Sequence, residues 1–117
     1  MVRNVEAKSP DGTEYVTGAS LYVLMSLASG DKHGHALMLD IEGFAGVRLG
    51  PGTLYKAIAR LEDGGLIEAL AADDRRRPYR LTPHGRMTLE RSVAYHQGIL
   101  AEGKRRLRVG PAMPTGG

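Results

Sequence analysis

The sequence predicts a mainly α-helical chain with a small β-hairpin, folded as a winged helix-turn-helix and followed by a C-terminal dimerisation helix. Three observations predict this fold class. Residues 50–65 read as a short helix with one apolar stripe, residues 66–81 as two strands around three arginines, and residues 83–108 as a long helix. The predicted organisation is a flexible N-terminal arm over 1–16, a winged helix-turn-helix domain over 17–82, the dimerisation helix over 83–108 and a disordered tail over 109–117.

The composition fits one small domain. The chain has 117 residues, of which 42% are hydrophobic, and it contains neither cysteine nor tryptophan. Without cysteine, disulfides and thiolate metal sites are excluded, as expected for a reducing compartment. No apolar run reaches the roughly 20 residues of a membrane span, and the N-terminus lacks the apolar segment of a signal peptide. We therefore expect a cytoplasmic protein without a membrane partner.

The distribution of charge says more than the net charge of +3, because twelve of the sixteen basic residues are arginines and they cluster. One cluster is Arg75-Arg76-Arg77 with Arg80, and the other is Lys104-Arg105-Arg106 with Arg108. Arginine binds phosphate through a planar fork of donors that lysine lacks. A solvated surface is the ordinary alternative, but the position of the first cluster after an exposed helix favours a nucleic acid.

Apolar spacing predicts two helices before that exposed helix. The residues before position 17 are polar and have no apolar period, which predicts the flexible arm. The first helix follows, and its apolar face holds Leu21, Leu24, Met25 and Ala28. After a turn at residues 31–34, the second helix has the apolar face Leu37, Ile41 and Phe44. Residues 45–50 are then the turn of a helix-turn-helix.

The helix that follows this turn has clear start and stop signals. Pro51 suits the first helical position, which makes Gly50 the N-cap. Leu54, Ile58 and Leu61 share one buried face. The opposite face is polar and basic, with Thr53, Lys56 and Arg60. The helix ends at Gly64-Gly65, where glycine adopts the left-handed conformation without penalty.

A hairpin and a long helix complete the chain. The predicted strands are residues 66–70 and 79–81, with Pro78 at the start of the second, and the loop between them carries the arginines. Asp73-Asp74 lie beside these arginines and could pair with them, which would weaken the local positive field.

Thr82 as N-cap and Pro83 at the first helical position then begin the last helix. Its apolar positions alternate in steps of four and three, as in a coiled coil. The predicted dimer interface is Leu89, Val93, His96, Leu100 and Leu107. Packing of this helix against the first helix of its own chain is the alternative.

These segments together resemble the PadR family of transcriptional regulators over about residues 20–85. The matching sequence motifs are His33-Gly34, Gly50-Pro51-Gly52-Thr53-Leu54-Tyr55, Arg60-Leu61-Glu62, Gly65-Leu66-Ile67 and Tyr79-Arg80-Leu81-Thr82. The resemblance implies a winged helix-turn-helix that binds double-stranded DNA as a homodimer, mostly as a repressor. It also implies a possible small-molecule effector at the dimer interface, in members with a single helix after the wing.

A dimer of this kind would place two recognition helices roughly 34–36 Å apart, in successive major grooves of a palindromic operator. Lys56 and Arg60 are then candidates for base edges, whereas Gly52 lets the backbone approach a phosphate. Tyr55 would either contact a phosphate or remain half-buried in the core, with its hydroxyl group in water. The full set of predicted DNA contacts is His33, Gly52, Thr53, Tyr55, Lys56, Arg60, Arg75, Arg76, Arg77 and Arg80.

Other classes of function have less support. His33 and His35 do not share a helical face, so a metal site is not expected and His33 reads as a turn or capping residue. The sequence has no nucleophile with an adjacent base and no phosphate loop, so we expect neither an enzyme nor a cofactor. The rival hypothesis is a winged-helix module that binds proteins. Because tryptophan is absent, flat aromatic effectors should bind weakly, and micromolar affinity in a titration would contradict this expectation.

Overall fold

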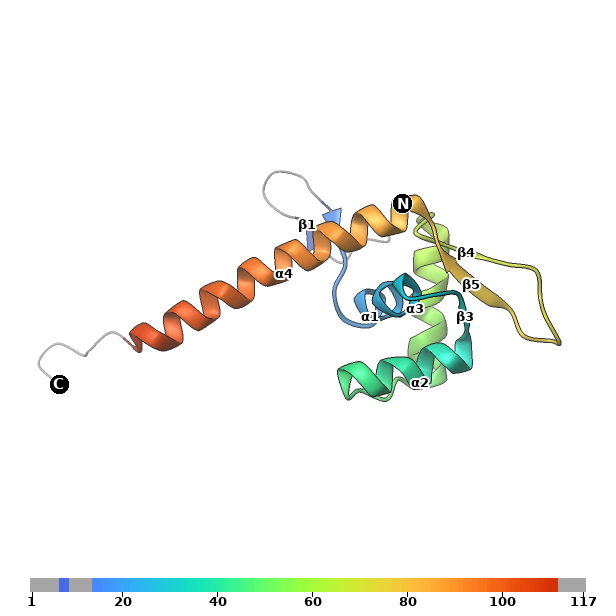
Figure 1. Cartoon of the computed structure of the whole chain (residues 1–117), viewed down its shortest axis with the longest axis horizontal. Coiled ribbons are helices and arrows are strands. Elements are labelled where there is room, and N and C mark those ends of the chain that lie inside the picture. Colours follow the sequence, from blue (N-terminus) through green and yellow to red (C-terminus); the bar gives the residue numbers. More distant parts are fainter. Residues whose placement is uncertain (1–6, 9–13, 112–117) are drawn as a thin grey trace, which may run out of the picture.

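The computed structural model of the protein describes residues 7–8 and 14–111. Three helices, α1 (Gly18–Ala28), α2 (Gly34–Ala45) and α3 (Pro51–Asp63), pack together, and a small sheet lies beside them (Figure 1). The long helix α4 (Pro83–Val109) crosses this body and extends away from it, which gives the molecule dimensions of 69 × 31 × 24 Å. The predicted fold class is confirmed: a helix-turn-helix is followed by a hairpin and one long helix.

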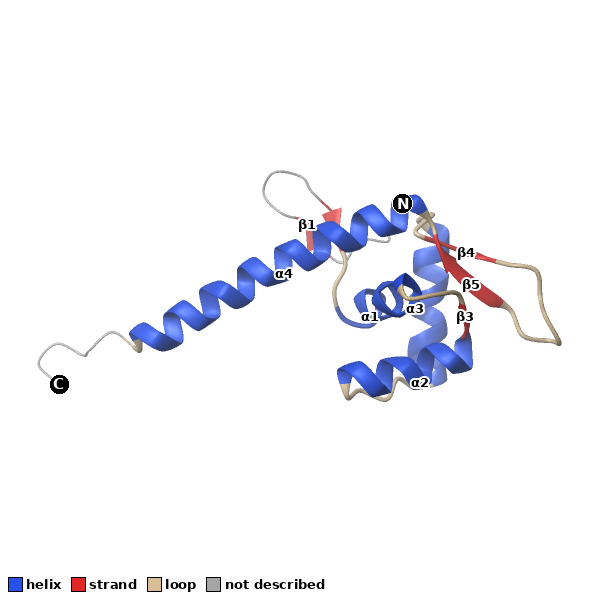
Figure 2. Ribbon diagram, in the orientation of Figure 1, coloured by secondary structure: helices blue, strands red, loops and turns tan. Residues whose placement is uncertain are grey.

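The sheet has three antiparallel strands in the order β3-β5-β4 (Figure 2). Strands β4 (Ile67–Ala69) and β5 (Pro78–Leu81) are the predicted hairpin, slightly shorter in its first strand than expected. The third strand, β3 (Lys32–His33), lies in the segment that was predicted to be a turn. Two residues cannot show a period of alternation, so only the pairing of Lys32 with Tyr79 reveals this strand.

The core is aliphatic and centres on α1, which contacts α2, α3, α4 and β5. Because neighbours surround it, α1 buries more than the single predicted stripe: Val23 and Leu27 are buried with Leu24. Met25 was expected in the core, but 38% of its surface is exposed. In α2, Leu37 and Ile41 are buried as predicted, whereas Phe44 is 44% exposed and meets the ring of Tyr22 edge to face.

The chain is ordered earlier than the predicted boundary of the flexible arm at residue 16. Strands β1 (Ala7–Lys8) and β2 (Glu14–Tyr15) pair with each other, and Tyr15 and Val16 are buried. The Val16 N–H donates to Ser92 Oγ in α4 at 3.0 Å. The ring of Tyr15 stacks on that of Tyr95, with centroids 3.9 Å apart. This segment therefore packs against its own chain, and the rest of the arm lies outside the described residues.

The predicted helix starts are present. His33 is the N-cap of α2 and its Nδ1 accepts from the Ala36 N–H at 3.4 Å. Thr82 is the N-cap of α4, and its hydroxyl accepts from the Gly85 N–H at 2.9 Å. Gly50 precedes Pro51 at the start of α3, and the glycine that adopts the left-handed conformation after this helix is Gly65, with φ +74°.

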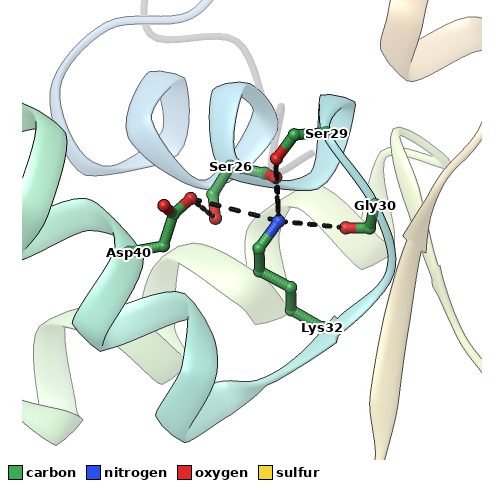
Figure 3. Close-up of polar contacts among 5 residues, drawn as sticks. All are labelled: Ser26, Ser29, Gly30, Lys32 and Asp40. Atoms are coloured by element: carbon green, nitrogen blue, oxygen red, sulfur yellow. Dashed lines mark hydrogen bonds and ion pairs between the residues drawn. The ribbon is translucent and has the colours of Figure 1, made fainter.

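A lysine joins the end of α1 to β3 and α2 (Figure 3). Lys32 Nζ donates to the carbonyl oxygen of Ser26 at 2.5 Å and to Ser29 Oγ at 2.9 Å. The Asp40 carboxylate of α2 lies 4.0 Å from the same nitrogen and accepts from Ser26 Oγ at 2.5 Å. A cation at the carbonyl end of a helix is favourable, so Lys32 fixes the chain where it passes into the helix-turn-helix.

Helix α4 changes its surroundings halfway along. In its first turns Gly85, Thr88, Leu89 and Ser92 are buried against the body of the molecule. Beyond them, the same face carries Leu100 and Leu107 with exposed fractions of 64% and 83%. The alternative of packing against α1 is thus realised by the first half of α4, while the second half has no cover from the described chain. No helix among the described residues is long and apolar enough to cross a bilayer.

The contact between α4 and the hairpin predicts a large effect of one small substitution. A Cβ atom on Gly85 would lie 1.9 Å from the Leu66 carbonyl oxygen, which is backbone and cannot rotate away. We expect Gly85→Ala to lower the free energy of unfolding by about 3 kcal/mol, at the upper end of the usual cost of overpacking. Urea unfolding followed by circular dichroism measures this change.

Gly43→Ala is the matched control for this prediction. Gly43 is exposed within α2, and nothing lies within 4 Å of the position of its Cβ. Alanine is the better helix former, so this variant should be more stable by about 0.5–1 kcal/mol. Equal stabilities of the two variants would contradict the close packing of Gly85 on Leu66.

Candidate nucleic-acid interface

Helix α3 separates its apolar and polar faces along its whole length. Leu54, Ala57, Ile58 and Leu61 are buried in the core. The remaining face is exposed and carries the residues that were predicted to touch DNA, namely Gly52, Thr53, Tyr55, Lys56 and Arg60. The buried stripe fixes the rotation of the helix about its axis, so these side chains are presented together to solvent.

The structure divides this exposed face into two flanks. Thr53, Lys56 and Arg60 line a groove of about 320 Å³ against the first turn of α1. Tyr55 lies on the other flank, toward the start of α2 and the hairpin. The predicted contacts of α3 therefore do not form one uniform stripe, and the two flanks have different neighbours.

Tyr55 and the three arginines of the hairpin loop line one groove. This groove has a volume of about 400 Å³ and is lined by residues of β3, α2, α3, the hairpin turn and the β5 side of the hairpin. Its lining is His33, Gly34, His35, Tyr55, Arg75, Arg76, Arg77 and Tyr79. Burial raises the pKa of the Tyr79 hydroxyl, which therefore stays neutral beside the arginines. The structure thus brings together His33, Tyr55 and the arginine loop, which are far apart in the sequence.

Gly34 allows Tyr55 to take this position, and the sequence reasoning missed this role. A Cβ atom on Gly34 would lie 2.1 Å from the Tyr55 hydroxyl oxygen and 2.7 Å from the ring carbon that carries it. The tyrosine ring therefore lies directly over the first residue of α2, and half of its surface is exposed. The His33-Gly34 pair in the sequence was a signal for this contact, but only the structure shows which side chain uses the space.

The hairpin turn, hereafter the wing tip, has an unusual backbone. Asp73 and Arg76 exchange both backbone hydrogen bonds, at 2.6 and 2.8 Å, around the two residues between them. Asp74 and Arg75 have φ values of +49° and +68°. Two-residue turns with positive φ at both positions usually contain glycine or asparagine. An arginine in this conformation costs about 1 kcal/mol or more, and its side chain is exposed at the end of the wing.

The ion pairs of the wing differ from those that the sequence suggested for the Asp73-Asp74 pair and for Arg80. Neither Asp73 nor Asp74 forms an ion pair with the three arginines among the described residues, so the acidic pair does not neutralise them directly. Arg80, in contrast, pairs with Glu68 on the facing strand through Nε at 2.9 Å and Nη2 at 2.6 Å. The hydrogen bond to Glu68 raises the pKa of Arg80. Arg80 thus has a partner within the sheet, which the sequence did not indicate.

His33 links the wing to α2. Arg76 Nη1 lies 3.3 Å from His33 Nε2, while the N–H of Ala36 donates to the other ring nitrogen. A neutral imidazole has one acceptor nitrogen, so His33 accepts either from the wing or from the first turn of α2. His33 is thus a capping residue, as predicted, beside the groove. No group of three or more metal-ligating side chains exists in the described part of the chain.

The second half of α4 presents an apolar face to solvent. Val93, Leu100 and Leu107 recur every seven residues and are 39%, 64% and 83% exposed. His96 lies on the same face, where its Nδ1 is 2.6 Å from the carbonyl oxygen of Ser92. Leu89, which was predicted at the dimer interface, is only 8% exposed because the core of its own chain covers it. A partner helix would therefore meet the stripe beyond Leu89.

An exposed second helix of a helix-turn-helix, with a basic wing beside it, defines the winged-helix class of transcription regulators. The chain belongs to the PadR-like family of transcriptional regulators, whose family model matches residues 23–91. The description of this family is that of transcriptional regulators.

Two relatives and one solved structure are similar to this chain. An uncharacterized 37.1 kDa protein in transposon TN4556 of Streptomyces fradiae is 51% identical over 75 residues, which cover 64% of this chain and 22% of that protein. Transcriptional regulator Rv3488 of Mycobacterium tuberculosis is 42% identical over 72 residues, which cover 59% of this chain and 66% of that protein. The chain thus spans less than two thirds of either relative. A solved transcriptional regulator from Clostridium thermocellum has a TM-score of 0.65 at 26% identity, over 74% of this chain and 88% of that one.

Proposed function

We propose that the protein is a sequence-specific DNA-binding repressor that binds a palindromic operator as a homodimer. The observation that carries the proposal is the groove shared by Tyr55 of α3 and by Arg75, Arg76 and Arg77 of the wing. Arginines favour phosphates, and a groove that joins a recognition helix to them suits the backbone of one DNA strand. In this arrangement α3 enters the major groove while the wing follows the adjacent phosphates or enters the minor groove.

Dimerisation supplies the second half of the proposed site. The exposed stripe Val93, Leu100 and Leu107 on α4 has the seven-residue spacing of a coiled-coil seam. Two copies joined along this stripe would carry two α3 helices, each for one half of the operator. Because His96 lies within the stripe, its ring needs a polar partner or water in the dimer.

A small-molecule effector would act at the same seam, because a ligand between the two α4 helices changes the separation of the two recognition helices. Flat aromatic ligands should bind there weakly, since the chain has no tryptophan. The neighbouring rings of Tyr15 and Tyr95 are already stacked on each other. Calorimetric titration with planar aromatic drugs measures this affinity, and a micromolar value would contradict the expectation.

The proposal is tested by gel-shift assays on the DNA upstream of the protein's own coding region, at two salt concentrations. Binding through several phosphates releases counterions, so the affinity should fall steeply between about 50 and 200 mM salt. A winged-helix module that binds proteins would show weak DNA binding without preference for this region. Failure to bind any duplex at low salt would overturn the proposal.

The position of Tyr55 gives a specific prediction for DNA binding. Gly34→Ala places a methyl group where the Tyr55 hydroxyl lies, and this half-exposed side chain must move away. We expect the variant to fold normally and to lose roughly tenfold in operator affinity, about the value of one hydrogen bond to a charged group. Fluorescence anisotropy with a labelled operator measures the loss.

The double variant Gly34→Ala/Tyr55→Ala makes this prediction sharper. If Gly34 acts by leaving room for Tyr55, the double variant should bind DNA no more weakly than Tyr55→Ala alone. Additive losses would show that Gly34 affects binding by another route. Thermal unfolding of each variant separates a loss of affinity from a loss of folded protein.

A further inference from the structure

The first turn of α1 and one flank of α3 form a second groove, separate from the one that Tyr55 and the wing arginines share. Thr17, Gly18 and Ser20 lie on one side, and Thr53, Lys56 and Arg60 lie on the other, around about 320 Å³. Gly18 has a φ of +56°, a conformation that favours glycine, so the chain bends sharply into the helix at this point. The groove is continuous with the exposed face of α3 through Thr53 and Lys56.

Ser20 is a buried polar residue at this groove. It is only 3% exposed, it lines this groove, and its hydroxyl has no hydrogen-bond partner among the described residues. A buried hydroxyl without a partner costs about 1–3 kcal/mol relative to one that is satisfied. A ligand in the groove that accepts a hydrogen bond from Ser20 would satisfy this hydroxyl.

The other groups around the groove are also donors or cations. The first backbone N–H groups of a helix have no partner within the helix, and the N-cap Thr17 makes no side-chain hydrogen bond to them. Lys56 and Arg60 add positive charge on the opposite wall, and none of the described residues that line the groove is acidic. Helix N-termini with adjacent cations bind phosphate-like anions, so an anion fits this donor set better than any neutral or cationic ligand.

We propose that this groove is a binding site for a phosphate group, held by the first turn of α1, the Ser20 hydroxyl, Lys56 and Arg60. The chemistry is the same for a DNA backbone phosphate and for a free phosphate-bearing small molecule. The first source rests on the proposed DNA-binding function, since the groove opens beside the recognition helix. In either case Lys56 and Arg60 contact phosphate, which replaces their predicted role at base edges.

Ser20→Ala tests the site with little risk to the fold. Removal of a buried hydroxyl that has no partner should leave the stability unchanged or raise it slightly, whereas phosphate binding should weaken about tenfold. A structural role for Ser20 predicts the opposite pattern, with lower stability and unchanged binding. Lys56→Ala should weaken binding more strongly, and Lys104→Ala on α4 removes the same charge outside the groove as a control.

For the DNA source, neutral methylphosphonate linkages are introduced one at a time along an operator duplex. One linkage should reduce the affinity of the natural protein about tenfold but have little effect on Ser20→Ala or Lys56→Ala, because these variants have already lost the contact. The Lys104→Ala control should respond to that linkage like the natural protein. This coupling at a single linkage supports a backbone phosphate in the groove.

For the free source, the DNA-free protein is titrated with inorganic phosphate while the amide NMR signals of residues 18–20 are followed. Saturable shifts in the natural protein that are lost in Ser20→Ala support a small-molecule phosphate site. Neither coupling at any linkage nor saturable shifts would overturn the proposal. If no duplex binds at all, the DNA-binding function fails, but the phosphate titration still decides this inference.

Discussion

Replacement of the three wing arginines, Arg75, Arg76 and Arg77, by alanine should weaken DNA binding about equally for all sequences. Each lost phosphate contact is worth about 1 kcal/mol, so the affinity should fall roughly a hundredfold. The slope of log affinity against log salt should become shallower by about 0.9 per lost contact. The measurement is a salt titration of anisotropy with an operator and with an unrelated duplex.

A control with the same change in charge distinguishes contacts from the general field of the protein. Arg91, Lys104 and Arg108 are exposed on α4, and their triple replacement by alanine removes three positive charges far from the wing. This control should bind with nearly the natural salt slope. If both triple variants lose the same affinity, the wing has no special role and the basic character of the chain accounts for binding.

The double variant Val93→Glu/Leu100→Glu should be monomeric and should lose operator binding almost completely. Both side chains are exposed in the single chain, so glutamates there do not disturb the core, but they would face each other across a helix pair. Loss of the dimer removes the gain from binding two half-sites at once, which is on the order of a thousandfold. Sedimentation equilibrium measures the mass, and anisotropy measures the affinity.

Ala94→Glu/Ala101→Glu is the matched control for the dimer. These two positions are also seven residues apart and exposed, but they lie about 100° away from the stripe on the α-helix. The control should remain dimeric and bind the operator. A natural protein that is monomeric at micromolar concentration, or a Val93→Glu/Leu100→Glu variant that stays dimeric, would contradict the proposed seam.

The sequence was sufficient wherever local chemistry decides the structure. The Gly50-Pro51 and Thr82-Pro83 pairs predicted the starts of α3 and α4, because a proline at the first helical position loses no hydrogen bond. The spacing of Leu54, Ile58 and Leu61 predicted the buried face of α3, because residues at these intervals lie on one side of an α-helix. The fold class followed from these signals and from their order along the chain.

Features that depend on distant contacts were not predictable. Strand β3 is too short for any pattern and exists through its pairing with β5. Val16 is buried and its N–H donates to Ser92 of α4. This partner is 76 residues away in the sequence, so the residues near position 16 could not predict the contact. Arg80 appeared to belong to the arginine cluster in the sequence, yet the register of β4 and β5 places Glu68 directly opposite it.

In the candidate site, too, local features were predictable from the sequence and features that depend on distant contacts were not. The predicted residues of α3 are all exposed, as their spacing indicated. Their separation into a flank beside the wing and a flank beside α1 depends on how three helices pack. A helical wheel cannot show this, because it places each side chain relative to one axis only.

The two halves of α4 have a mechanical consequence. The first half is anchored in the body that carries α3, so the helix behaves as a stiff lever about 40 Å long, at 1.5 Å per residue. In the proposed dimer, a tilt of about 5° at the far end would displace the opposite end by about 3.5 Å, close to the spacing of successive nucleotides along one DNA strand. A small change in the angle between the two α4 helices would therefore displace each α3 helix along the operator by about one nucleotide.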